Sequence, residues 1–308
     1  MNRIQAVVLL GSLAGLCSCD DFEGFGRVQQ DFHYSYTMQP GGHLDVDNRN
    51  GSISIIGWDR DSVDVAGTKY APTDADLKEV HIKVDVTGRM ASITTESPRE
   101  AWGNYGANYT IHLPHNTVVT RAKSTNGSVT AEDMSAGGSL SSTNGRISLH
   151  RDDGNFDLHT TNGGIELEDC SGVERAETTN GSVRGILKAG AFEARSTNGA
   201  IDLTLLKPRH DEALRASTTN GTITVALREF AGNPIHVETT HGGVTLRLPH
   251  DTDARIEART SLSHITSELP VSSEESDKHE LRGQLGKGGP VISASTTTGS
   301  IRIEDGGR

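Results

Sequence analysis

Short stretches of alternating hydrophobic and polar residues run through most of the chain. One stretch contains Ile147 and Leu149 and lies between the pairs Asn144-Gly145 and Asp153-Gly154. Alternation of this kind is typical of β-strands that turn one face inward. Asn-Gly and Asp-Gly pairs are typical of turns. The pattern therefore predicts an all-β chain of short strands.

An Asn-Gly turn recurs every eighteen residues through the middle of the chain. Thr precedes each turn, and Ser or Thr precedes that Thr. The asparagines of these turns, the last of them after a longer step, are Asn126, Asn144, Asn162, Asn180, Asn198 and Asn220. Related turns follow at His241-Gly242 and Thr298-Gly299, and Thr260–Ile265 is a degenerate copy with Leu262 at the Asn position. Repetition at a fixed period indicates a stack of equivalent units.

Eighteen residues hold two short strands and two turns, which is too few for two strands joined by a helix. The repeat therefore predicts a single-stranded parallel β-helix, in which each strand pairs with the same strand of the next coil. The usual handedness of parallel crossovers favours a right-handed winding. A left-handed coil of three hexapeptides would turn Asp153 and His159 inward, and their polarity argues against it.

Stacking assigns a role to each column of equivalent residues. The asparagines are expected about 4.8 Å apart, so that their side-chain amides form a ladder. The glycine after each Asn is expected to supply the positive φ of a tight turn. One inward column is Ala122, Leu140, Leu158, Ala176, Ala194, Ala216, Val237 and Ala294.

Outward columns alternate in charge from coil to coil. They are Asp157, Arg175, Glu193 and Arg215; then His159, Glu177 and Arg195; and, beyond the turn, Glu166, Arg184 and Asp202. Opposite charges on adjacent strands are mildly stabilising. We therefore interpret these carboxylates as partners that support the register of the coils.

Changes in the pattern predict four segments. They are a signal peptide over residues 1–18, a tether over 19–31, an N-terminal β segment of opening coils and a cap over 32–122, and the β-solenoid repeats over 123–306. A cap is expected because a bare solenoid end would pair with the edge of another molecule.

The first segment predicts export. The apolar run Ile4–Leu16 follows Arg3 and is too short to span a bilayer. The sequence Leu16-Cys17-Ser18-Cys19 resembles the bacterial lipobox, which implies lipidation of Cys19; Cys17 is the poorer fit, and an ordinary secretory signal is the alternative. Acyl chains on such a cysteine would anchor the chain stably. Cys170 would then have no partner for a disulfide.

Several further motifs resemble the bacterial putative-adhesin family, a group of uncharacterised β-helical envelope proteins. They are Gly42–Val46 followed by Asn50–Ile53, then Gly57-Trp58-Asp59, the Thr-Asn-Gly turns, and the ending Gly288–Pro290 to Thr297–Ile301. The resemblance covers about residues 32–305. It implies a β-helical envelope protein and offers no catalytic residue to carry over. Thr298 departs from the usual Asn.

Composition agrees with a thin, elongated core, because only 33% of the 308 residues are hydrophobic and 4% aromatic. The formal net charge of −12 argues against a nucleic-acid partner, which needs a basic face, and against electrostatic attraction to anionic lipid.

The sequence offers little chemistry. A polysaccharide-active enzyme would need two carboxylates across a groove. The candidates cluster in adjacent coils and are Asp152, Asp153, Glu166, Glu168 and Asp169. Short coils leave no long loops to wall a cleft around them. Trp102 and Tyr105 are the best candidates for ligand contact, whereas Trp58, His112 and His115 are expected to be structural. We expect no metal site and no cofactor.

The function predicted from these observations is a non-catalytic, lipid-anchored envelope protein. It would be an adhesin-like or scaffold rod that presents a repetitive surface to a protein or glycan partner, with the membrane and its face left open. The alternatives are a self-assembling scaffold, a polysaccharide-active enzyme, or an envelope-stress sensor. The expected cap favours a monomer over a polymer.

Overall fold

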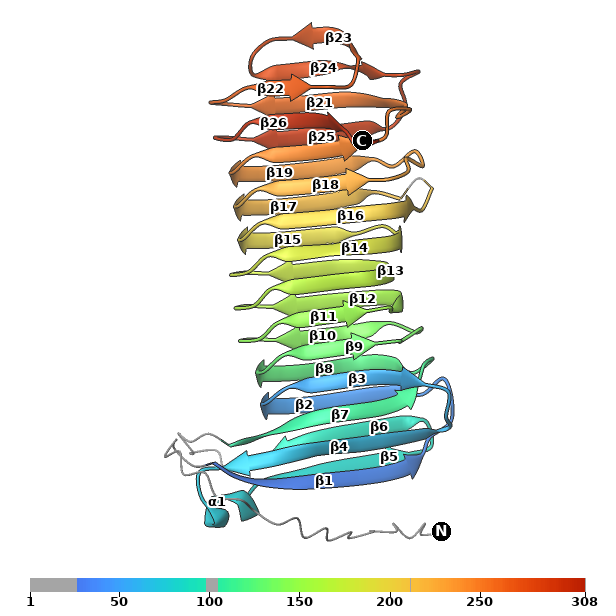
Figure 1. Cartoon of the computed structure of the whole chain (residues 1–308), viewed down its shortest axis with the longest axis vertical. Helices are drawn as coiled ribbons and strands as arrows, with labels where there is room; N and C mark the ends of the chain where they lie inside the picture. Colours follow the sequence, from blue (N-terminus) through green and yellow to red (C-terminus); the bar gives the residue numbers. More distant parts are fainter. Residues whose placement is uncertain (1–26, 98–104, 211, 308) are drawn as a thin grey trace, which may run out of the picture.

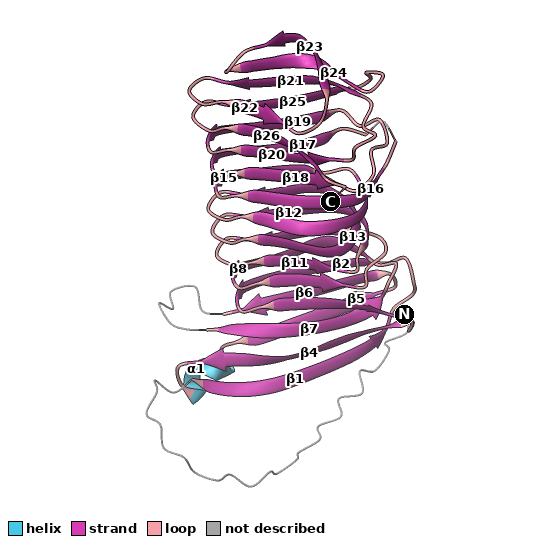
Figure 2. Ribbon diagram, turned by 45° about the horizontal axis from the view of Figure 1, so that its top comes forward, coloured by secondary structure: helices cyan, strands magenta, loops and turns pink. Residues whose placement is uncertain are grey.

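The protein is an elongated stack of β-coils in two facing sheets (Figures 1 and 2). The computed structural model describes residues 27–97, 105–210 and 212–307. These ranges contain 26 strands and one short helix, α1 (Asp74–Lys78). The predicted all-β class is therefore confirmed. No helix in the described ranges is long and apolar enough to cross a membrane.

The pre-turn sheet contains the strands that lead into the Asn-Gly turns. In spatial order they are β5 (His81–Thr87), β6 (Met90–Glu96), β2 (His43–Asn50), β8 (Val118–Asn126), β10 (Gly138–Ser142), β12 (Asp153–Thr160), the second part of β13 (Ile165–Thr178), β15 (Glu193–Asn198), β17 (Leu214–Asn220), β19 (Ile235–His241), β25 (Val291–Thr296), β21 (Ala254–Thr260), β24 (Glu280–Leu285) and β23 (Val271–Ser276).

The post-turn sheet contains the strands that leave those turns. Its order is β1 (Val28–Thr37), β4 (Ser62–Ala71), β7 (Gly106–Pro114), β3 (Ile53–Trp58), β9 (Val129–Glu132), β11 (Ile147–His150), the first part of β13, β14 (Val183–Gly190), β16 (Ile201–Pro208), β18 (Ile223–Leu227), β20 (Val244–Leu248), β26 (Ile301–Asp305) and β22 (Ile265–Ser267).

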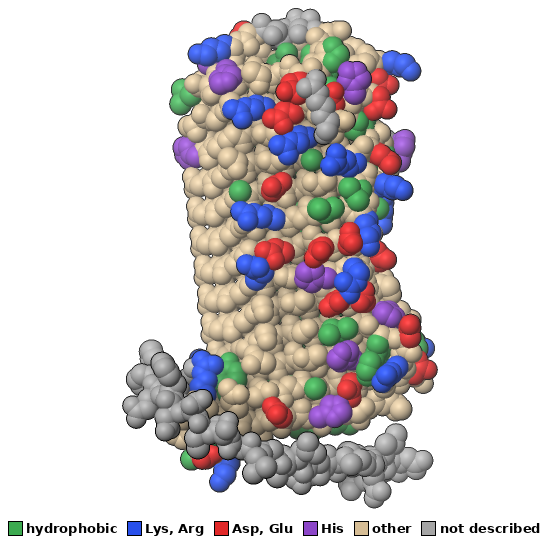
Figure 3. Space-filling model, in the orientation of Figure 1, with side chains coloured by type: hydrophobic (Ala, Val, Ile, Leu, Met, Phe, Trp, Pro, Cys, Tyr) green, Lys and Arg blue, Asp and Glu red, His purple; other side chains and the backbone are tan. Residues whose placement is uncertain are grey.

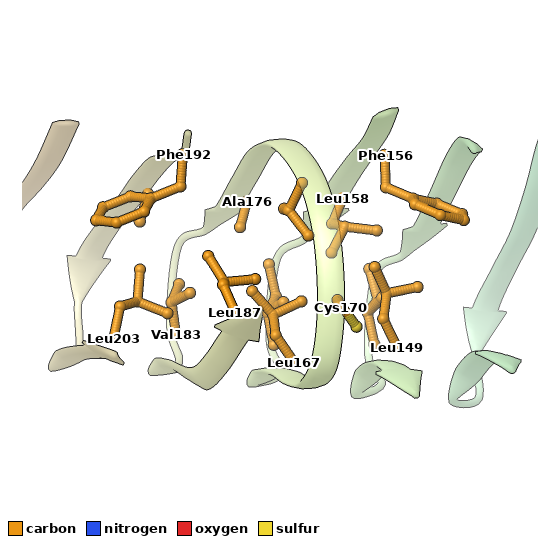
Figure 4. Close-up of a cluster of buried hydrophobic side chains, with 14 of the residues drawn as sticks. Leu149, Phe156, Leu158, Leu167, Cys170, Ala176, Val183, Leu187, Phe192 and Leu203 are labelled. Atoms are coloured by element: carbon orange, nitrogen blue, oxygen red, sulfur yellow. The ribbon is translucent and has the colours of Figure 1, made fainter. Parts of the chain in front are cut away.

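Neighbouring coils are parallel and in register. Leu140 lies beside Leu158 in the pre-turn sheet, and Ile147 lies beside Ile165 in the post-turn sheet. The inward columns fill the space between the sheets, and every member of the column from Ala122 to Ala294 is at most 3% exposed. In Figure 4, Leu149, Val183 and other side chains of the post-turn sheet face Phe156 and Leu158 across this narrow core.

The coils do not stack in the order of the sequence at the C-terminal end. The last coil of the chain, β25–β26, lies between β19–β20 and β21–β22. The degenerate copy with Leu262 is therefore outermost, although it precedes Thr298 in the sequence. Strands β24 and β23 then add in antiparallel orientation and end the pre-turn sheet, whereas the post-turn sheet ends at the three-residue strand β22.

The N-terminal end is built in a similar way. The coil β2–β3 pairs with β8–β9 on one side and with β6 and β7 on the other. Antiparallel β5 and β4, followed by β1, end the two sheets. The half-buried rings of Phe32, Tyr34 and Tyr36 pack on the end of the core.

These pairings differ from two expected segment boundaries. The parallel stack has no break at residue 122, because Val46 pairs with Ala122 and Asn50 with Asn126. Strand β1 begins at Val28, inside the expected tether, because its residues pair with β4.

Candidate functional site

A continuous ladder of asparagine amides runs along the Asn-Gly turns. Each Nδ2 donates to the Oδ1 of the asparagine in the coil before it, over 2.8–2.9 Å for each step from Asn144 to Asn220. The ladder extends beyond the six predicted residues, since Asn126 donates to Asn50 and Asn50 donates to the backbone oxygen of Tyr105. Hydrogen bonds that continue from coil to coil indicate a structural role for these side chains.

A second ladder lies inside the turn and was not predicted. The Ser or Thr two positions before each Asn is buried, and its hydroxyl donates to the backbone oxygen of a turn glycine in the adjacent coil. Thr178, for example, donates to Gly163 over 2.8 Å. Thr296 donates to Gly242 and Thr260 to Gly299, which follows the spatial order of the coils. The invariable Ser or Thr at this position was the available signal.

The turn glycines are required for space, and the expectation of positive φ for them is wrong at most positions. Only Gly51 among them has a φ in the left-handed region. A Cβ on Gly163 would lie 2.0 Å from the backbone oxygen of Gly145. Backbones of successive turns are therefore too close for any side chain.

Left-handed backbone occurs instead at the other turn of each coil, where the post-turn strand leads back to the pre-turn sheet. Asp133, Arg151 and Asp169 have φ of 55–58° and stack in adjacent coils. Arg151 donates from Nε and Nη2 to the two carboxylate oxygens of Asp133, each over 2.9 Å, and also pairs with Glu132. This bidentate contact stabilises a backbone conformation that costs free energy in non-glycine residues.

The next residue, Asp152, is fully buried. Its Oδ1 accepts a hydrogen bond from the Met134 amide over 2.7 Å, whereas Oδ2 has no partner within the described residues. Burial raises the pKa of this carboxyl to about 7, against 3.8 for an ordinary Asp. Burial likewise raises the pKa of the Cys170 thiol to about 11. Neither group is exposed to a substrate.

The other carboxylates, which were candidates only for the alternative of a polysaccharide-active enzyme, do not form a cleft. Glu166 pairs with Arg146 over 2.9 Å, and Glu168 pairs with His150 over 3.1 Å. Asp153 and Asp169 lie at the exposed surface. None of these five carboxylates lines the surface hollows described below. The arrangement offers no pair of carboxylates across a groove.

Of the two residues predicted to contact a ligand, Trp102 and Tyr105, the structure describes only Tyr105. Trp102 lies outside the described residues, as do Cys17 and Cys19. Tyr105 is half-buried and packs on a small cluster of Ala71, Leu77 and Val80. Partial burial, and then the neighbouring Asp76 carboxylate, raise the pKa of its phenol. Tyr105 therefore contributes to the packing of α1 against the N-terminal cap.

Trp58 stabilises a turn at the same end of the rod. Its Nε1 donates to the backbone oxygen of Ser62 over 2.9 Å. The indole stacks on His112 at 5.2 Å, and the guanidinium of Arg60 covers its ring at 4.8 Å. His115 contacts Asp59 and the backbone of Asp133. Within the described ranges, no group of three or more His, Cys, Asp or Glu side chains is arranged to hold a metal ion.

The charge columns have the predicted register, since Arg175 lies between Asp157 and Glu193. The ion pairs of Arg175 and Arg195, however, run along the strand: Arg175 contacts Glu177 over 2.8 Å, and Arg195 contacts Glu193. Figure 3 shows charged side chains gathered in a band along the rod, while the flank on the left carries few of them.

Three hollows follow one another on the outer face of the pre-turn sheet. The first, of about 320 Å³, lies beside β13, β15 and β17 at the ends where the loops before β15 and β17 enter them. The second, also of about 320 Å³, spans β15 to β25, and the third, of about 200 Å³, spans β25 to β24. Glu193 and Arg215 line both the first and the second. Ser293 and Ser295 line both the second and the third. The three hollows therefore form one trough, which we call the polar trough.

Several proteins of known structure resemble this chain over most of its length. The fold is similar to that of a putative adhesin from Bacteroides fragilis NCTC 9343 (16% identity, 89% of this chain and 97% of the other, TM-score 0.39). It is also similar to a putative adhesin (10% identity, 89% and 97%, TM-score 0.39) and a putative lipid binding protein (10% identity, 90% and 96%, TM-score 0.36), both from Parabacteroides distasonis ATCC 8503.

No curated protein sequence matches the chain. The family model described as Toastrack DUF4097 matches residues 41–304, which are β2 to β25 and most of β26. The chain therefore belongs to the Toastrack DUF4097 family.

Proposed function

We propose that this protein is a non-catalytic rod of the bacterial cell envelope, anchored by a lipidated Cys19 and presenting its sides to a partner. The observation that carries the proposal is a regular stack of coils with antiparallel strands at both ends. Its carboxylates are buried, ion-paired or scattered over the surface. Such a molecule is suited to hold a surface at a distance from an anchor.

The anchor is supported by the sequence Leu16-Cys17-Ser18-Cys19 after a short apolar run. Strand β1 begins at Val28, so eight residues would separate Cys19 from this strand. Fully extended, such a segment reaches about 29 Å. The N-terminal cap would then face the membrane, and the far end of the rod would point away from it. We also propose that the coil is right-handed with about 18 residues, following the usual crossover rule.

Metabolic labelling with an alkyne-bearing fatty acid tests the anchor. The wild-type chain and Cys17→Ser are expected to incorporate the label and to sediment with membranes, whereas Cys19→Ser loses both properties. Labelling of Cys19→Ser at the wild-type level would overturn the assignment of the anchor.

A further inference from the structure

Three small residues form the floor of the polar trough, at positions where the same columns carry long side chains in other coils. Outward positions of the pre-turn sheet carry Arg, Glu or His in most coils, but Ser217, Ser293 and Ser295 interrupt these columns. Strand β25, which carries two of the serines, lies between β19 and β21. The trough therefore depends on the insertion of the last coil.

The walls of the trough carry charged groups that form no ion pair with another described residue. No ion pair in the described ranges joins Arg215, Glu238 or Glu257 to another side chain. His236 contacts the hydroxyl of Ser293 over 2.8 Å. Donors and acceptors thus alternate beside a floor of hydroxyls.

The shape of the trough selects an extended ligand. Its strands, from β13 through β15, β17, β19, β25 and β21 to β24, are adjacent in one sheet. At about 4.8 Å for each step, the trough runs roughly 29 Å along the axis of the rod. A peptide would need a free strand edge for its backbone hydrogen bonds, but the strands of this floor are paired on both sides.

The charges narrow the chemistry further. One free Arg and two free Glu in a chain of net charge −12 do not suit a polyanion. Phe192, which lines the first hollow, is only 4% exposed and offers no stacking platform. Groups that both donate and accept hydrogen bonds, repeated along a chain, complement this surface.

We propose that the polar trough binds a linear, hydroxyl-rich polysaccharide that carries little or no charge. Its hydroxyls exchange hydrogen bonds with Ser217, Ser293 and Ser295 on the floor and with Arg215 and Glu238 on the walls. This assignment rests on the proposed non-catalytic binding role and gives its partner a chemical class. Without aromatic stacking, each site binds weakly, and affinity grows with the length of the polysaccharide.

Isothermal titration calorimetry tests this proposal, with the full chain titrated with cellohexaose and, separately, with chitohexaose. At least one of these neutral hexasaccharides is expected to bind, and more tightly than hexagalacturonate, a polyanion. The double variant Ser217→Leu/Ser295→Leu fills the floor and is expected to weaken binding at least tenfold. Arg215→Gln is expected to weaken binding by a smaller factor.

The matched control is Thr224→Leu/Thr245→Leu, at outward positions of the post-turn sheet in the coils β17–β18 and β19–β20, the first of which also carries Ser217. It should bind as the wild type does, and equal melting temperatures of both double variants show that each is folded. Absence of binding by both neutral hexasaccharides would overturn the proposal, as would equal affinities of the two double variants or tighter binding of hexagalacturonate. Labelling at Cys19 is independent of each of these results.

Discussion

Single residues stabilise this protein mainly through contacts with their equivalents in the next coil. The Asn amides, the Ser and Thr hydroxyls and the turn glycines each form a column, and each column has a different physical cause. Hydrogen bonds explain the first two, and close packing of backbones explains the third. Substitutions therefore have effects that depend on the column more than on the residue type.

The buried hydroxyl of Thr178 provides a direct test of the inner ladder. Thr178→Val removes the hydrogen bond to Gly163 and is expected to lower the free energy of unfolding by about 1–2 kcal/mol. Thr179→Val, at the neighbouring outward position, should change it by less than about 0.5 kcal/mol. Urea denaturation measures both, and equal effects would contradict the assigned role.

Substitutions in the glycine column are expected to destabilise the fold more than substitutions in the hydroxyl ladder. Gly163→Ala forces a Cβ into the backbone of the adjacent turn and should cost about 2–4 kcal/mol of unfolding free energy. Gly164→Ala is the control, because its Cβ would lie 3.3 Å from the nearest atom, the backbone oxygen of Ser182. Thermal unfolding of the two variants distinguishes crowding from a general loss of glycine flexibility, which predicts similar effects at both positions.

Asp152 makes stability depend on pH. The pKa of its carboxyl is raised in the folded state, so its contribution is fully present below pH 3.8 and is lost as the pH rises through about 7. The interval from 3.8 to about 7 corresponds to at most about 4 kcal/mol. Asp152→Asn should therefore become more stable than the wild type as the pH rises from 4 to 8. The exposed control Asp153→Asn should show no such trend. A pH-independent difference for Asp152→Asn would argue against a raised pKa of the Asp152 carboxyl.

At the scale of elements, stacking order is what distinguishes the ends of the rod from its middle. Coils in the middle follow the sequence, whereas the first and last coils of the chain are inserted one place inward. Each insertion leaves the outer position to a coil that leads into antiparallel strands. The antiparallel strands at the ends and the polar trough both result from this arrangement.

A pair of asparagines tests the order at the C-terminal end. Residue 298 lies directly beside residue 241 only if β25 follows β19. The double variant His241→Asn/Thr298→Asn would then extend the amide ladder from Asn220, with a coupling energy of about 0.5–1.5 kcal/mol between the two sites. Additive single effects in a double-mutant cycle would contradict this order. His241→Asn/Leu262→Asn is the control pair, since the coil of Leu262 lies one place further out.

The local repeat made the strands, the turns and the Asn columns predictable, because each copy has the same neighbours at a constant separation. The order of the last coils was not predictable, since Leu262 replaces the Asn in one copy and Thr298 in another. Strand alternation is compatible with either order. The trough was missed for the same reason: Ser293 and Ser295 are distant in sequence from His236 and Glu238 but lie beside them in the sheet. The φ of the turn glycines was misjudged because crowding between coils has no signature within one turn.

At the scale of the whole molecule, the arrangement of strands describes a rod that is closed at both ends and open along its sides. Antiparallel strands and half-buried side chains cover the N-terminal end, while at the other end β24 and β23 extend the pre-turn sheet beyond the short last strand of the post-turn sheet, β22. End-to-end stacking would require parallel edges in register, as occur inside the rod. Binding along the sides remains compatible with this closure. The fold thus favours a single molecule that acts as a spacer and a binding surface.

Sedimentation velocity of the chain over a hundredfold range of concentration tests this account most directly. We expect one species with the mass of a monomer, a high frictional ratio and a sedimentation coefficient that does not rise with concentration. Species that grow with concentration, and that dissociate on dilution, would show that the ends are competent to stack. That result would contradict the capped rod and favour a self-assembling scaffold.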